Sequence, residues 1–148
     1  MQFNEYSEKE KNLVKDIVAS LSKEMPVAVL KDKRLWTITT IEDFEDGREK
    51  TVHNDIDQLA FSRLFEEANA ENGKISVIQK ETNNVVVKIF QNGKLNDFNN
   101  FPSVVKINDE NIIGKYLNED WKNISVEDFS NLCHNDENVE AKRTYMVP

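Results

Sequence analysis

The chain has 148 residues, a net charge of −8 at neutral pH and a hydrophobic fraction of 39%. This length fits one domain that buries roughly 70% of its unfolded surface, and the frequency of Phe, Ile, Val and Leu excludes a disordered chain. The single cysteine, Cys133, excludes an internal disulfide framework and a zinc site built from several cysteines, and the acidic balance argues against a nucleic-acid binder.

The first predicted element is a helix that begins with a capping box. In Ser7-Glu8-Lys9-Glu10 the hydroxyl and the carboxylate can each accept a hydrogen bond from the other residue's backbone amide. Apolar residues then recur at helical spacing until Met25-Pro26, where the residue before proline is pushed out of the helical conformation. Runs rich in β-branched residues follow at 27–30 and 35–41, and the charged turn between them predicts a hairpin.

A second helix is predicted near the middle of the chain. An acidic connection with a turn signal at Asp46-Gly47 leads into a short predicted strand over 51–53. Asn54 or Asp55 can cap the helix that follows. We expect this helix to end at Asn72-Gly73, which is a signal for a left-handed cap.

The pattern changes to strand periodicity after the second helix. It predicts an antiparallel meander and one further strand, over residues 75–80, 85–90, 94–98 and 103–107. Two short helices are expected next, one opened by Asn108 or Asp109 and continuing to Trp121, and one beginning at Ser125. Residues 135–148 have little to bury and form either a loosely held tail or an edge strand.

Together these elements predict a single α+β domain over residues 1–148. We expect an antiparallel sheet of about five or six strands, with the two main helices on one face and short C-terminal helices. The polar N-terminus does not resemble a secretory signal, and no apolar run approaches the roughly 20 residues of a membrane span. The expected location is therefore the cytoplasm.

Two segments bring metal-binding residue types together, and both have simpler explanations. His53-Asn54-Asp55-Ile56-Asp57 holds an imidazole and two carboxylates, but acids at a helix start are explained by the first-turn amides and the helix dipole. The run from Asp109 to Asp120 partly matches a calcium loop, yet it has Ile113 at one ligand position and Asp120 where a bidentate Glu is needed. The sequence therefore predicts no metal and no cofactor.

Nucleophilic catalysis has little support in the sequence. Cys133 and His134 are adjacent, but neighbouring helix residues point about 100 degrees apart, so the imidazole does not face the sulfur. We expect Cys133 to be a small core residue, which His53 could reach only through the fold. No serine elbow or glycine-rich phosphate loop is present, so we expect a protein that is not an enzyme.

Most of the negative charge lies in the C-terminal third. Between Leu95 and Glu140 there are ten carboxylates against three lysines, and eight of the ten form adjacent pairs that recur at intervals of ten, eight and nine residues. Helix starts explain part of this pattern, because acids are favoured at the positive end of the helix dipole. The sharper hypothesis is a negative surface, anchored by aromatic residues, that attracts a basic groove.

The sequence thus predicts a small acidic protein-binding inhibitor of bacterial or phage origin, with the role of an immunity or anti-defence protein. Its expected partner is a basic protein, such as a nuclease, a toxin or a nucleic-acid-binding defence protein, with no direct contact to nucleic acid or membrane; a homodimer is also compatible with the sequence. The predicted partner-binding residues are Asp109, Glu110, Glu119, Asp120, Trp121, Glu127, Asp128, Asp136 and Glu137.

Two alternatives stay open at this stage. One is a small-molecule-binding or enzymatic α+β domain with a pocket between the sheet and its helices. The other is an adaptor subunit of an obligate complex, which an exposed apolar patch around Trp121 would support.

Overall fold

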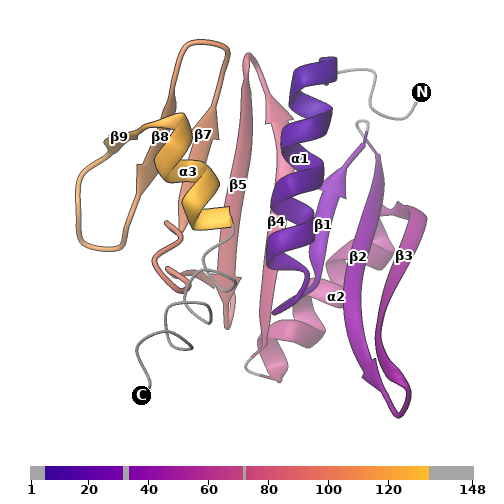
Figure 1. Cartoon of the computed structure of the whole chain (residues 1–148). Helices are drawn as coiled ribbons and strands as arrows, with labels where there is room; N and C mark the ends of the chain where they lie inside the picture. The colour runs from indigo at the N-terminus through magenta and orange to yellow at the C-terminus, as the bar shows by residue number, and fades with distance from the viewer. Residues whose placement is uncertain (1–5, 32–33, 72, 134–148) are drawn as a thin grey trace, which may run out of the picture.

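The computed structural model describes residues 6–31, 34–71 and 73–133, which form a mixed α+β fold (Figure 1). The helices within these residues are α1 (Glu8–Leu21), α2 (Gln58–Ala70) and α3 (Val126–Cys133). The strands are β1 (Val27–Leu30), β2 (Leu35–Phe44), β3 (Gly47–Asp57), β4 (Lys74–Glu81), β5 (Asn84–Gln91), β6 (Lys94–Leu95), β7 (Val104–Ile107), β8 (Ile112–Lys115) and β9 (Lys122–Ile124).

All of these strands belong to one sheet with the order β3-β2-β1-β4-β5-β7-β8-β9, and β6 adds a short pairing to β5. Neighbouring strands are antiparallel except β1 and β4, which run parallel with Val27 opposite Ser76. The chain leaves β1, forms β2, β3 and α2, and returns to the other side of β1 as β4. The helix α2 therefore lies within the crossover that joins the two parallel strands.

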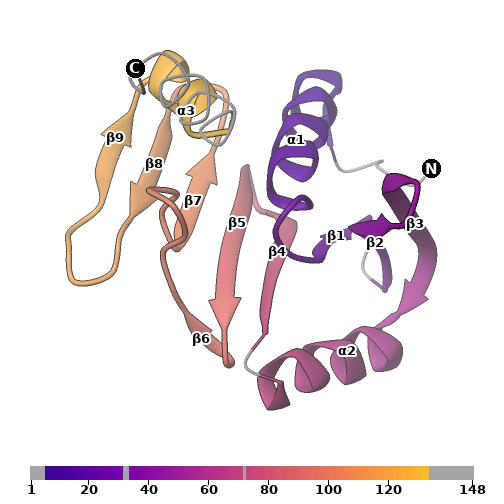
Figure 2. The same cartoon turned by 60° about the horizontal axis from the view of Figure 1, so that its bottom comes forward.

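Helices cover both faces of the sheet, as Figure 1 and Figure 2 show together. α1 and α3 pack on one face, over a core that includes the fully buried Ile17, Ile78 and Val87. α2 packs on the other face, where Trp36 and Phe61 belong to a second core. Among the described elements α2 packs mainly against β2, β3 and β4, and its Phe65 also meets Phe90 of β5, so it covers only part of its face.

The predicted N-terminal helix is confirmed together with its capping box. The Glu10 amide donates to the Ser7 hydroxyl at 3.1 Å, and the Ser7 amide donates to the Glu10 carboxylate at 2.8 Å. The apolar positions Val14, Ile17 and Leu21 then face the core. No described helix is long and apolar enough to cross a membrane.

The predicted sheet and layer arrangement are wrong in three respects. The sheet has nine strands, where about five or six were expected, and it is mixed because β1 and β4 are parallel. The two main helices pack on opposite faces. The described C-terminal part contains one helix, α3. The parallel pairing explains the second error, because α2 is the crossover between β1 and β4 and lies on one face, while α1 precedes β1 and covers the other.

The helix predicted between Asn108 and Trp121 is also wrong. Ile112–Lys115 forms β8, which pairs with β7 on one side and β9 on the other. The Asn108 side chain accepts hydrogen bonds from the Glu110 and Asn111 amides at 2.8 and 2.9 Å, which closes a turn where a helix cap was expected. The adjacent isoleucines of β8 point to opposite faces of the sheet, as strand geometry requires.

The second predicted helix is confirmed, but its cap is Asp57 and not Asn54 or Asp55. The Asp57 carboxylate accepts a hydrogen bond from the Ala60 amide at 2.8 Å. β3 continues to this residue, so the strand expected over 51–53 is much longer. Asp55 has a left-handed φ of 60° at an irregularity in the β2–β3 pairing, and its carboxylate binds Lys31 at 3.0 Å.

Candidate functional site

A polar cleft lies beside the first turn of α1, on the face of the sheet that α1 and α3 cover. It has a volume of about 380 Å³ and is lined by Ser7, Glu10, Lys80, Asn83, Asn108, Asp109 and Glu110. We name it the Glu10 cleft. Its lining holds three carboxylates and one lysine, so it carries excess negative charge. Two of these acids, Asp109 and Glu110, are predicted partner-binding residues.

Three segments that are distant in sequence build the Glu10 cleft. They are the first turn of α1, the β4–β5 turn and the β7–β8 turn. Val85 of β5 lies opposite Lys80 of β4 and Ile107 of β7, which places the two turns side by side at one end of the sheet. A hydrogen bond of 3.1 Å from the Asn108 side-chain amide to that of Asn84 links the turns directly.

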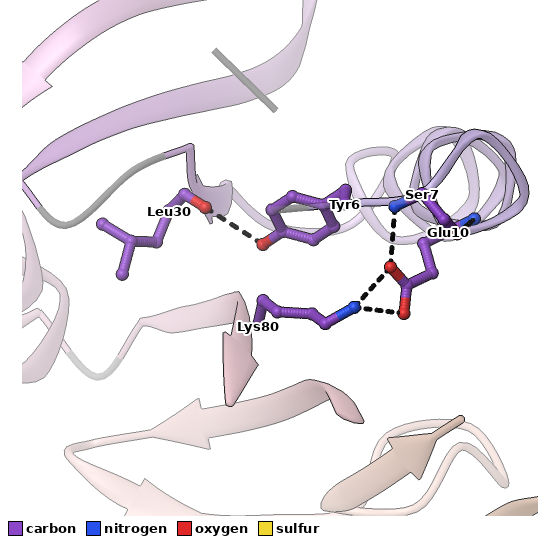
Figure 3. Close-up of polar contacts among 5 residues, drawn as sticks. All are labelled: Tyr6, Ser7, Glu10, Leu30 and Lys80. Atoms are coloured by element: carbon purple, nitrogen blue, oxygen red, sulfur yellow. Dashed lines mark hydrogen bonds and ion pairs between the residues drawn. The ribbon is translucent and has the colours of Figure 1, made fainter. Parts of the chain in front are cut away.

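An ion pair between Glu10 and Lys80 lies at the edge of the cleft (Figure 3). The Lys80 Nζ donates to both Glu10 oxygens, at 2.5 and 2.6 Å. The Ser7 amide adds a further hydrogen bond to Glu10 Oε1. The Tyr6 hydroxyl donates to the Leu30 carbonyl at 3.0 Å, which ties the residues before α1 to β1. Glu10 is 7% exposed, so the pair is largely shielded from water.

The environment keeps Glu10 charged. Burial disfavours a carboxylate and so raises the pKa of Glu10, but the hydrogen bonds from Lys80 and Ser7 and the positive charge of Lys80 together outweigh burial. The net result is a pKa below the ordinary value of 4.5. Glu10 is therefore a poor general base at neutral pH, and both members of the pair are already occupied by each other.

Asp109 and Glu110 differ from Glu10 because their carboxylates are exposed and unused. The turn that holds them is closed by the Asn108 side chain, which accepts from the Glu110 and Asn111 backbone amides, and not by their own carboxylates. Within the part of the chain that the structure describes, neither carboxylate makes a hydrogen bond or an ion pair. The cleft therefore combines a satisfied ion pair with two carboxylates that are free to bind a cation.

The structure divides the other predicted partner-binding residues among separate places. Glu119 and Asp128 line a second cleft of about 480 Å³, together with Tyr116 and Lys122. There the Lys122 Nζ lies 2.8 Å from the Glu119 carboxylate. The β8–β9 turn that carries Glu119 and Asp120 lies at the opposite end of β8 from Asp109 and Glu110.

Three further predicted residues line neither cleft. Asp120 and Glu127 are exposed, the latter in the first turn of α3. Trp121 is 41% exposed, and the Lys106 Nζ lies 5.0 Å from its ring centroid. The last two, Asp136 and Glu137, lie outside the described residues. The predicted acidic pairs are therefore not placed on one continuous track.

The structure also places Cys133 and His53, the two residues considered for nucleophilic catalysis. Cys133 is buried on α3, and burial, followed by the negative charge of Asp16, raises the pKa of its thiol to about 12. His53 lies on the edge strand β3, at the far side of the sheet from α3 (Figure 1). No group of three potential metal ligands occurs among the described residues.

The sequence held a signal for the ion pair that the sequence interpretation missed. The capping-box pattern explains Glu10 by itself, and the strand pattern alone gives Lys80 no partner. In β4 the side chains of Ser76, Ile78 and Lys80 point to the same face, which α1 covers. A lysine at a core-facing strand position needs an acidic partner, and Glu10 on α1 provides it.

No protein-family model matches the sequence, and no curated protein or solved structure matches it. The function is therefore argued from the residues of the cleft.

Proposed function

We propose that the protein binds a basic partner protein and that the Glu10 cleft receives a Lys or Arg side chain of that partner. The observation that carries this proposal is the pair Asp109 and Glu110, whose carboxylates have no cation among the described residues. The one lysine that lines the cleft, Lys80, is already held by Glu10. An entering cation meets unsatisfied carboxylates and does not have to displace a resident partner.

The geometry of the cleft suits a guanidinium or ammonium group. Charge-assisted hydrogen bonds from a cation to a carboxylate are about twice as strong as neutral ones, and a guanidinium can bind a carboxylate through two parallel bonds. The side-chain amide of Asn83 adds a polar acceptor in the same volume, whereas the oxygens of Ser7 and Asn108 already accept from backbone amides. The net charge of −8 would also speed the encounter with a positively charged surface.

The partner class that the sequence predicts is a nuclease, a toxin or another nucleic-acid-acting protein, because such proteins carry basic grooves. An acidic protein that occupies such a groove competes with the phosphate backbone and so inhibits the enzyme. In this proposal the protein is a non-enzymatic inhibitor, and the cleft is its anchor point at one end of the sheet.

The test is binding to a panel of purified nucleases and nucleic-acid-binding proteins, measured by biolayer interferometry at low and high salt. We expect at least one basic panel member to bind, with affinity that falls as salt rises. Changing Asp109→Asn and Glu110→Gln together should weaken this binding by about tenfold or more, because each lost charged contact is worth roughly 1 kcal/mol or more.

A matched control is available on the other face of the sheet. Glu66 and Glu67 are adjacent, exposed acids on α2, so Glu66→Gln with Glu67→Gln removes the same charge far from the cleft and should leave the affinity nearly unchanged. An equal loss of affinity in both double variants would show that binding depends on net charge and not on the Glu10 cleft, which would contradict the proposal. Binding that ignores salt, or no binding to any basic panel member, would reject the proposal.

A further inference from the structure

A groove runs between α2 and the sheet, on the face opposite the Glu10 cleft. It has a volume of about 310 Å³, and its aromatic walls are Trp36, Phe61, Phe65 and Phe90. Trp36 and Phe61 stack with ring centroids 3.9 Å apart, and Phe65 meets Phe90 edge to face at 5.1 Å. These contacts hold the aromatic rings in fixed positions, so the groove is formed before any ligand binds.

The groove exists because α2 covers only part of its face of the sheet. In Figure 2 α2 lies below the β1 and β4 side, and the strand β5 emerges beside it. The groove is lined on the sheet side by Val77 of β4 and by Lys88 and Phe90 of β5, which point to this face. These residues lie beside the part of the sheet that α2 covers. One wall is thus helix and the other is open sheet.

Lys88 is the charged residue that lines this groove. It is half-buried, with Val77 and Val104 as its cross-strand neighbours. Within residues 6–31, 34–71 and 73–133 its ammonium makes no hydrogen bond and no ion pair. The nearby amides are in use, because Gln58 accepts from the Trp36 indole at 3.0 Å and Gln79 donates to Glu81 at 2.9 Å.

Lys88 lies between valines and makes no ion pair among the described residues, so its ammonium is available to an anion. An anion placed against it would form a charge-assisted hydrogen bond. Because the adjacent volume is apolar and aromatic, the complementary ligand has an apolar body attached to its anionic group. The observed volume lies at the low end of the roughly 300–1,000 Å³ of small-molecule sites, which limits the body to about two or three rings.

We propose that this groove binds a small amphipathic anion, with a flat apolar body against Phe65 and Phe90 and a carboxylate, sulfonate or phosphate group on Lys88. The site is separate from the Glu10 cleft, since the sheet lies between them. Its test therefore stands or fails independently of the proposed partner binding.

Two dyes with the same ring system make the test specific. Anilinonaphthalene sulfonate carries the required anion, and phenylnaphthylamine is its neutral counterpart. Fluorescence titration of the native protein should give saturable binding of both dyes. Lys88→Met keeps the apolar stem and removes the charge, so it should weaken the anionic dye by about tenfold and leave the neutral dye unchanged. Lys106→Met, on the same face but outside the groove, should change neither affinity.

A second measurement guards against dye binding to partly unfolded protein. The chain has two tryptophans, Trp36 in the groove and Trp121 directly before β9, so each indole N–H gives its own NMR signal. The anionic dye should shift the Trp36 signal and leave Trp121 in place. Equal affinity of the anionic dye for wild type and Lys88→Met, a shift confined to Trp121, or no binding of either dye to the native protein would overturn the proposal.

Discussion

Breaking the Glu10–Lys80 pair should destabilise the fold more than any surface ion pair of this protein. The side chains are 9% and 17% exposed, so Glu10→Gln leaves a mostly buried ammonium without its anion. Removing one partner of a buried pair costs about 3–5 kcal/mol, and the residual exposure of Lys80 favours the lower end, about 3 kcal/mol. The new amide can still accept the hydrogen bond from the Ser7 backbone, so the helix cap is kept.

A double-mutant cycle separates the pair from its surroundings. Lys80→Met keeps the apolar stem, and we expect the double variant to be less destabilised than the sum of the single variants, with a coupling of about 2 kcal/mol. Urea unfolding followed by circular dichroism measures all four proteins. Additivity of the two single changes to within about 0.5 kcal/mol would refute the pair as a stabilising unit.

The same pair predicts a pH dependence with a definite sign. The pKa of Glu10 lies below its ordinary value of 4.5 in the folded protein, so its stabilisation is fully present above that value. This contribution is lost as the pH falls through the folded pKa. The stability gap between wild type and Glu10→Gln should therefore shrink in acid, and a gap of constant size would contradict the assignment.

Three further predictions concern individual side chains. Cys133, whose thiol pKa burial raises to about 12, should react with a thiol reagent at neutral pH only after unfolding in urea; fast labelling of the native protein would contradict its burial. Asp57→Ala should cost about 1 kcal/mol in urea unfolding as a lost helix cap, while Asn54→Ala should cost less than about half of that. Gly114→Ala should lower stability by about 1–3 kcal/mol, because the added Cβ would lie 2.7 Å from Ile124 Cδ1, and Ile124→Val in the same variant should recover part of the loss in thermal melts.

The sequence predicted correctly those features that depend on contacts between residues close together in the chain. The capping box at Ser7 and the hairpin at 27–30 and 35–41 are both present. Each depends on neighbours within a few positions. The second helix is also present, although its cap lies two or three residues later than expected.

Non-local contacts explain what the sequence interpretation missed. The spacing of the apolar residues between Ile112 and Trp121 suits one face of a helix, but pairing with β7 and β9 decides in favour of a strand. The parallel register of β1 and β4 leaves no trace in either strand, since both are simply rich in β-branched residues. The Glu10 cleft depends on that arrangement, because its walls come from α1, β4 and the β7–β8 turn.

The parallel contact between β1 and β4 also divides the chain into two parts that can form early. β1, β2 and β3 are linked by sequential antiparallel pairing, and so are β4, β5, β7, β8 and β9. The pairing of Ala28 with Val77 joins them across the whole of β2, β3 and α2, so it closes the longest loop in the sheet, and we expect this step of folding to be slow. Until it closes, both parts expose an unpaired strand edge, and a second copy of the chain can take the missing place. We therefore expect folding speed and resistance to strand-swapped dimers to depend on the same few residues.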